Sequence, residues 1–153
     1  MDDIEELEQI ENSIGDEEID EIIERWGTIL NSPELNFRSD FSLQEIKELR
    51  VRLDQCYTIA RWELSLAKKE IAYIDAVWDF AEHIYAYKSN LGSVTDRKNE
   101  GKAKLAISKY NIQHTHAEAK VKILEGVVDV LSQKMMTISS FIALEKIISG
   151  ENM

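Results

Sequence analysis

The chain has 153 residues, of which 44% are hydrophobic and 31% charged, and it contains six Gly, one Pro and one Cys. This length suits a single domain of ordinary size, and a lone cysteine excludes a disulfide-stapled scaffold. The formal net charge is −11, which for the chain as a whole argues against a nucleic-acid partner. The sequence has neither a long uninterrupted apolar run nor a basic N-terminus, so we expect a soluble cytoplasmic protein without a membrane span or signal peptide.

The net charge is concentrated in an N-terminal arm, residues 1–31. Residues 1–24 contain twelve acids and no Lys or Arg, whereas residues 25–153 contain 17 acids and all 18 bases. Apolar residues at helical spacing predict helices in the arm, and Gly15 followed by Asp16, a favourable N-cap, predicts a break between two short helices. We expect six acids of the arm to contact a basic partner: Asp16, Glu17, Glu18, Asp20, Glu21 and Glu24.

A linker and a long helix follow the arm. A Ser-Pro pair ends the last helix of the arm, and residues 32–41 predict a linker. Ser42 and Glu45 match the capping-box pattern S-x-x-E and open a helix over 42–88 that contains no Gly or Pro. Its apolar residues form a heptad seam with one stutter: Ile46, Leu49, Leu53, Cys56, Ala60, Leu64, Ala67, Ile71, Ile74, Trp78, Ala81 and Tyr85.

The turn-rich segment 89–95 predicts the tip of a hairpin whose second helix runs over 96–148. Residues 42–153 therefore predict a long antiparallel helical hairpin, and the fold class is all-α and coiled-coil-like. The second helix has two apolar rows. Gly126 lies between the rows, where the missing side chain permits a close approach of another backbone at a cost in helix stability.

One hairpin cannot cover both apolar rows, so we expect a homo-oligomer. The row expected to form its interface is Val121, Leu124, Val128, Leu131, Met135, Ile138 and Ile142. The flanking row is Ile123, Val127, Val130, Phe141, Leu144 and Ile148. The alternative is that Ile19, Ile22 and Trp26 of the same chain cover the flanking row.

Motifs for enzymatic chemistry are missing from the sequence, so we expect no enzyme, no cofactor and no metal site. The chain has no glycine-rich phosphate loop, no dinucleotide fingerprint, no nucleophile elbow and no H-E-x-x-H. His114 and His116 are two residues apart, so on a helix their side chains point away from each other and do not chelate a metal easily. Cys56 lies on the apolar seam and is expected to be a core residue.

A basic segment surrounds the expected tip. Eight bases and three acids lie between residues 88 and 122. Positive charges that follow phosphates, together with aromatic rings that stack on bases, bind single strands without sequence preference. We expect this role for Lys88, Arg97, Lys98, Lys102, Lys104, Lys109, Tyr85 and Tyr87. The alternative is a polar hairpin tip with solvated lysines.

The order of features over residues 57–148 points to a family. A long helix ends in a stretch with Tyr85 and Tyr87, a loop with Gly92 follows, and the pair Asp96 and Arg97 opens the second helix. Further residues at family-like spacing are Lys104, Ser108, Asp129, Ser132, Ile138, Ser140 and Lys146. In this order the chain resembles the UvsY family, the recombination mediators of T4-type phages.

The resemblance implies a cytoplasmic oligomer that binds single-stranded DNA, contacts the single-strand-binding protein and loads a RecA-like recombinase. It implies phosphate contacts for Lys88, Arg97, Lys98, Lys102 and Lys104, and assembly through the C-terminal helix. The arm is more acidic than the family pattern, a difference that bears on DNA binding by the intact chain.

Two other functions stay open. The acidic arm could imitate nucleic acid in a protein-protein interaction module, such as a phage inhibitor of host defence, because clustered carboxylates fit a basic groove. The long helices could also belong to a structural or assembly coiled coil.

Overall fold

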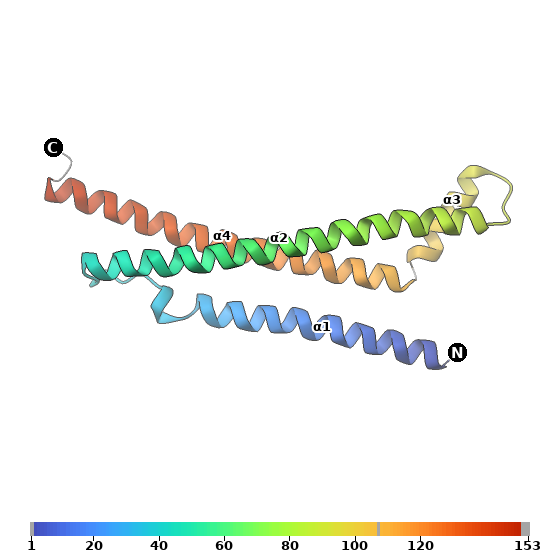
Figure 1. The fold of residues 1–153 in the computed structure, drawn as a ribbon, viewed down its shortest axis with the longest axis horizontal. Helices are drawn as coiled ribbons and strands as arrows, with labels where there is room; N and C mark the ends of the chain where they lie inside the picture. Colours follow the sequence, from blue (N-terminus) through green and yellow to red (C-terminus); the bar gives the residue numbers. More distant parts are fainter. Residues whose placement is uncertain (1, 107, 151–153) are drawn as a thin grey trace. The chain divides into compact units, whose positions relative to one another are not determined.

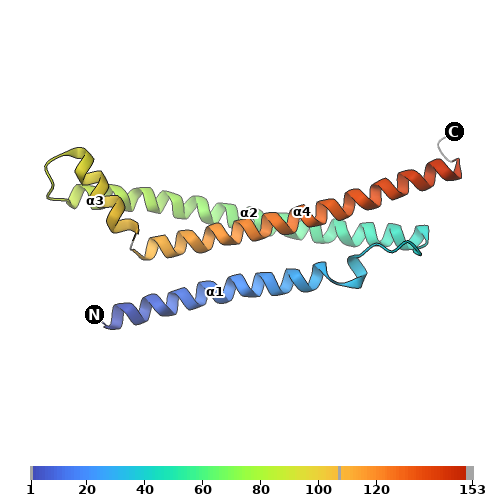
Figure 2. The same cartoon turned by 180° about the vertical axis from the view of Figure 1, so that it is seen from behind.

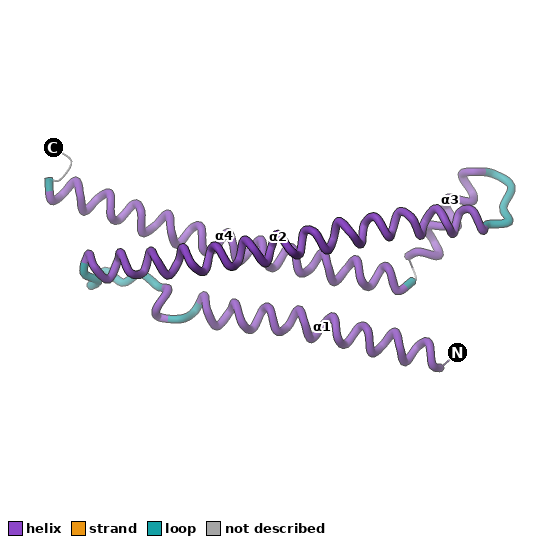
Figure 3. The backbone as a smooth tube through the Cα atoms, in the orientation of Figure 1, coloured by secondary structure: helices purple, strands orange, loops and turns teal. Residues whose placement is uncertain are grey.

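The computed structural model describes residues 2–106 and 108–150. Within these ranges the chain forms α-helices, one short 3-10 helix and loops, without strands (Figures 1 and 3). The elements are α1 (Asp2–Leu30), η1 (Pro33–Leu35), α2 (Leu43–Lys88), α3 (Val94–Ala106) and α4 (Lys109–Ser149). The predicted all-α class is therefore confirmed.

The chain divides into two compact units that cut across the long helices. Unit 1 comprises Met1–Glu21 and Ser65–Lys122, and unit 2 comprises Ile22–Leu64 and Ile123–Met153. The predicted division into an arm (1–31), a linker (32–41) and one continuous hairpin (42–153) stays a prediction.

The heptad seam of α2 is confirmed by burial. None of its twelve predicted residues is exposed, and Ile46, Leu49 and Leu53 are almost completely buried. The helix begins as the capping box predicts: the Ser42 backbone N–H donates to Glu45 Oε2 at 2.6 Å, and the Glu45 backbone N–H donates to Ser42 Oγ at 3.2 Å.

The order of the ion pairs in unit 1 gives the direction of α4 relative to α2. Asp75 of α2 contacts His114 of α4, and Glu70, further back on α2, contacts Lys120, further on along α4. The two helix segments of this unit therefore run in opposite directions.

The break expected at Gly15 and Asp16 is wrong, because α1 continues through both residues. A Cβ built on Gly15 would lie 1.9 Å from Nδ1 of His116, so the glycine lets the imidazole ring lie against the backbone of α1. The Nε2 atom of the same ring lies 3.2 Å from Asp16 Oδ1. Gly is roughly 1 kcal/mol less favourable than Ala inside a helix, but an alanine here would collide with the imidazole ring.

The uninterrupted second helix expected over 96–148 is also wrong, because α3 ends at Ala106 and α4 begins at Lys109. The expected tip over 89–95 is shortened as well, because α3 begins at Val94. Two views show α3 beside the C-terminal end of α2 (Figures 1 and 2).

Hydrogen bonds of Ser108 close the turn between α3 and α4. Ser108 Oγ donates to the Leu105 carbonyl at 2.6 Å, and the Ser108 backbone N–H donates to the same oxygen at 3.1 Å. Serine here closes a local turn in place of a further helical turn. Leu105, whose carbonyl accepts both hydrogen bonds, has a side chain that is completely shielded from solvent.

Within the described chain no atom lies within 4 Å of a Cβ built on Gly126, so a close backbone approach there by a second copy stays a prediction. Gly126 is exposed, so its face of α4 has no backbone opposite it. Within the chain it is Gly101 of α3 that lies close to another backbone: its Cβ would lie 3.0 Å from the Glu82 carbonyl oxygen and 3.2 Å from the Ala86 nitrogen of α2.

Candidate nucleic-acid interface

The predicted basic residues of α3 lie on two flanks of the helix. Gly101 and Leu105 face inward. Arg97 and Lys104 are seven residues apart and share one flank, whereas Lys98 and Lys102 are four apart and share the other. All four bases are exposed.

One flank of α3 is engaged by the protein itself. Arg97 Nε donates to the Leu91 carbonyl at 2.6 Å, and Lys104 Nζ lies 3.2 Å from Glu100 Oε1. Lys98 and Lys102 have no such partner among the side chains of residues 15–106 and 108–150. The flank with Lys98 and Lys102 is therefore the one that is open to a phosphate.

A cluster that the sequence did not predict holds α3 in place. Ser89, buried at the end of α2, donates its hydroxyl hydrogen to Glu100 Oε2, and the Leu91 backbone N–H donates to Ser89 Oγ at 3.2 Å. The hydrogen bond from Ser89 and, next, that from Lys104 hold the pKa of Glu100 below its usual range. A serine followed by a turn is the only sequence signal for this cluster.

The predicted aromatic residues differ in accessibility. The side chain of Tyr87 at the end of α2 is 86% exposed, whereas that of Tyr85 is half-buried in the apolar seam. Lys88 is exposed beside Tyr87. Tyr87 is thus available for stacking on a base, and Tyr85 belongs to the core.

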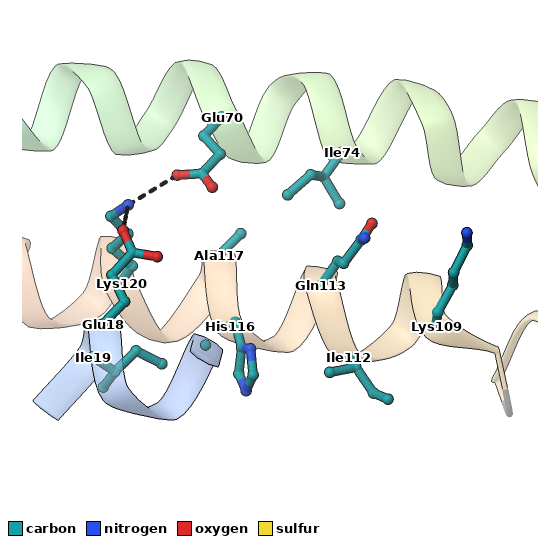
Figure 4. Close-up of a pocket in the computed structure, with 11 residues that line it drawn as sticks. Glu18, Ile19, Glu70, Ile74, Lys109, Ile112, Gln113, His116, Ala117 and Lys120 are labelled. Carbon is teal, nitrogen blue, oxygen red and sulfur yellow. Dashed lines mark hydrogen bonds and ion pairs between the residues drawn. The ribbon is translucent and has the colours of Figure 1, made fainter. Parts of the chain in front are cut away.

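The surroundings of Lys109 differ from those of the bases on α3. It begins α4 and lies 5.8 Å from the ring centre of Tyr110. It also lines an open pocket of about 330 Å³ in unit 1, together with Ile74, Gln113 and residues of α1 (Figure 4).

The acidic arm contacts α4 of the same chain. Lys120 Nζ lies 2.6 Å from Glu18 Oε1 and 3.2 Å from Glu70 Oε2, as Figure 4 shows. Burial lowers the pKa of Lys120, but hydrogen bonds and charges of the two carboxylates outweigh burial, so the pKa is raised overall. With the contact between Asp16 and His116, two of the six predicted partner acids are used within unit 1.

The other four acids remain open to solvent. Glu17, Asp20, Glu21 and Glu24 are exposed. Contact of these residues with another protein stays a prediction.

The residues predicted for oligomerisation are packed inside the chain. None of the seven is exposed, and Leu124, Leu131 and Ile138 are almost completely buried. The part of α4 that is open to a partner is the flanking row, where Val130, Leu144 and Ile148 are exposed. The other four residues of the predicted row, Val121, Val128, Met135 and Ile142, are half-buried, and their contact with a second copy stays a prediction.

The remaining chemical candidates have structural surroundings. His114 Nε2 lies 2.8 Å from Asp75 of α2, whereas His116 contacts α1, so the two imidazole rings diverge as helical geometry predicts. Within the described residues no group of three or more His, Cys, Asp or Glu side chains could hold a metal ion. Cys56 is half-buried, and burial raises the pKa of its thiol.

By length and composition alone α4 could cross a membrane, since its most apolar 18-residue stretch has a mean hydropathy of 1.3 and is 17% buried. A core helix of a soluble protein meets the same criterion, so the expectation of a soluble protein stays a prediction.

No family model matches the chain, and no curated protein or solved structure matches it either.

Proposed function

We propose that the protein binds single-stranded DNA through α3 and the C-terminal end of α2, as an accessory protein that helps to load a RecA-like recombinase. The observation that carries this proposal is the free charge in unit 1. Lys88, Lys98 and Lys102 are exposed and have no acidic partner among residues 15–106 and 108–150, whose side chains are described. Free ammonium groups release counterions from a strand when they meet its phosphates, which favours binding.

The interface would read no sequence. Lysines contact phosphates, which are the same in every strand, and Tyr87 offers a ring face that stacks on any base. Two acids of the arm, Asp16 and Glu18, contact His116 and Lys120 of α4 and not these three lysines. Among the arm's acids with described side chains, residues 16–24, none is paired with these lysines, despite the net charge of −11.

Salt dependence and substitution of the three lysines test the proposal. With three phosphate contacts, the logarithm of affinity for an oligo-dT probe falls with the logarithm of salt at a slope of about −2, or roughly 20-fold between 50 and 200 mM. The variant Lys88→Ala/Lys98→Ala/Lys102→Ala should lose most of this affinity in fluorescence anisotropy.

A matched control removes three exposed bases from unit 2: Lys47→Ala/Arg50→Ala/Arg52→Ala. This variant loses the same three positive charges as the test variant. If the position of the charges decides binding, the control should bind DNA like the wild type. Equal loss in both variants, or no binding by the wild type at low salt, would contradict the proposal.

Stacking is tested separately with Tyr87→Ala. Loss of one base-aromatic contact costs about 1–3 kcal/mol, or roughly 5- to 150-fold in affinity. Trp62→Ala removes another exposed aromatic ring, in unit 2, and should leave affinity unchanged. A Tyr87 variant that binds like the wild type would remove the tyrosine from the interface.

The loading step needs its own assay. We expect the protein to shorten the lag before a RecA-like recombinase hydrolyses ATP on single-stranded DNA covered by single-strand-binding protein. Neutralising the four exposed acids of the arm to Asn or Gln should preserve or raise DNA affinity. A different pair of results would identify the arm as a nucleic-acid mimic: no variant binds DNA, and neutralising the four acids abolishes the activity of the protein.

A further inference from the structure

The part of α2 in unit 1 has an apolar row that no described segment covers. Leu66, Tyr73 and Phe80 follow one another at intervals of seven residues and are 45%, 71% and 68% exposed. Residues seven apart differ by only about 20° around a helix, so the three side chains form one line on it. The inner seam of α2 occupies another face, and its residues are not exposed. We call this line the outer row.

Small and charged residues flank the outer row on one side. Along this side lie Lys69, Ala72, Ala76 and Asp79, all exposed. Two alanines in the middle leave room for another helix to approach closely. Lys69 and Asp79 are ten residues apart, about 15 Å along the helix axis, so they cannot pair with each other.

Both charges are also unpaired within the described part of the chain. Neither the Lys69 ammonium nor the Asp79 carboxylate has a partner there. The flank thus presents a positive charge at one end, a negative charge at the other and small residues between them. Such a pattern is self-complementary when it is turned end over end.

We propose that the outer row binds the outer row of a second copy of this chain, with the two α2 helices antiparallel about a two-fold axis near Tyr73. In this arrangement Lys69 of each copy faces Asp79 of the other, and Ala72 faces Ala76. A parallel two-fold pair would place the two charged flanks on opposite sides of the interface, so Lys69 of one copy would not meet Asp79 of the other. A two-fold contact uses the same patch on both copies and closes at the dimer.

The size of the patch sets the strength of the dimer. With about 200 Å² for a large aromatic side chain, Tyr73 and Phe80 together leave on the order of 280 Å² open in each chain. Adding Leu66 and the flanking side chains, two copies would bury roughly 800 Å², which is below a standard stable interface. We therefore expect a weak, reversible dimer that forms at micromolar concentrations.

Sedimentation of the full chain between 1 and 200 µM tests the proposal. The mass should rise from 17.6 kDa towards twice that value as concentration increases. The single variants Lys69→Glu and Asp79→Lys should each stay monomeric, because each places like charges opposite one another. The double variant Lys69→Glu/Asp79→Lys should dimerise again, because the reversed pair is complementary only in the antiparallel arrangement.

Controls separate this surface from the flanking row of α4. Phe80→Glu should abolish the dimer. Leu144→Glu/Ile148→Glu changes side chains of α4 that are exposed as well but lie outside the outer row, so it should leave the dimer intact. A mass of one chain at every concentration would overturn the proposal. So would single charge variants that dimerise normally, dissociation by the α4 variant alone, or a mass that grows beyond the dimer.

Discussion

Gly101 is the residue whose replacement tests most sharply how α3 is held on α2. In Gly101→Ala the new Cβ would lie 3.0 Å from the Glu82 carbonyl oxygen and 3.2 Å from the Ala86 nitrogen. Both are backbone atoms inside a helix, so α3 must move away by a few tenths of an ångström. Such overpacking typically costs about 1–3 kcal/mol, against a gain of about 1 kcal/mol in helix propensity.

The control is the same substitution at Gly126. No atom lies within 4 Å of a Cβ there, so Gly126→Ala keeps only the propensity gain. In urea unfolding followed by circular dichroism, we expect Gly126→Ala to be stabilised by about 0.5–1 kcal/mol. Gly101→Ala should be about 1–3 kcal/mol less stable than that control, with faster amide hydrogen exchange in α3. Equal stabilisation by both substitutions would refute the packing of α3 on α2 through Gly101.

Three further substitutions probe the core, an ion pair and a helix start. Leu131 is 0% exposed and Leu144 53%, so Leu131→Ala should cost about 2–5 kcal/mol in urea unfolding and Leu144→Ala little. The pKa of Lys120 is raised in the folded state, so its stabilisation is complete below the usual lysine pKa of about 10.4 and is lost as pH rises through the folded value. Lys120→Met should remove this alkaline loss of stability, and Lys122→Met should not. Ser42→Ala removes the side-chain acceptor of the capping box and should cost about 0.5–2 kcal/mol, measured by thermal unfolding.

The parts of the fold that sequence predicted are those with local causes. The seam of α2 follows from apolar spacing, and its start follows from Ser42 and Glu45, which bond to each other's backbone across three residues. These signals lie within one helix and need no knowledge of its neighbours.

The parts that sequence did not predict depend on residues far apart in the chain. Gly15 looks like a break, but His116, about a hundred residues later, lies against it. The end of α3 has no proline or glycine beside it, and α3 packs through Gly101 on the Glu82 and Ala86 backbone of α2. At the basic site, composition identifies the residue types but not that Arg97 is bonded to a carbonyl while Lys98 is free.

The same reasoning applies to the surface for self-association. Sequence placed the spare apolar row on α4, because that helix has two visible rows. On α2 the sequence shows one regular inner seam. Tyr73 and Phe80 lie outside this seam, although they are also separated by a heptad interval of seven residues. Only burial separates a row that fills the chain's own core from one that is left for a partner.

The two proposals together predict that strand length affects affinity. If two copies pair antiparallel near Tyr73, Lys88 of each copy lies about 15 residues from the axis, so the two basic ends are roughly 45 Å apart. A DNA strand that spans this distance would engage both ends and gain affinity without any new contact. We expect long oligonucleotides to bind the wild type more tightly than short ones, and Lys69→Glu to lose this difference while binding short ones normally. A length effect that persists in Lys69→Glu would show that the gain comes from a single chain.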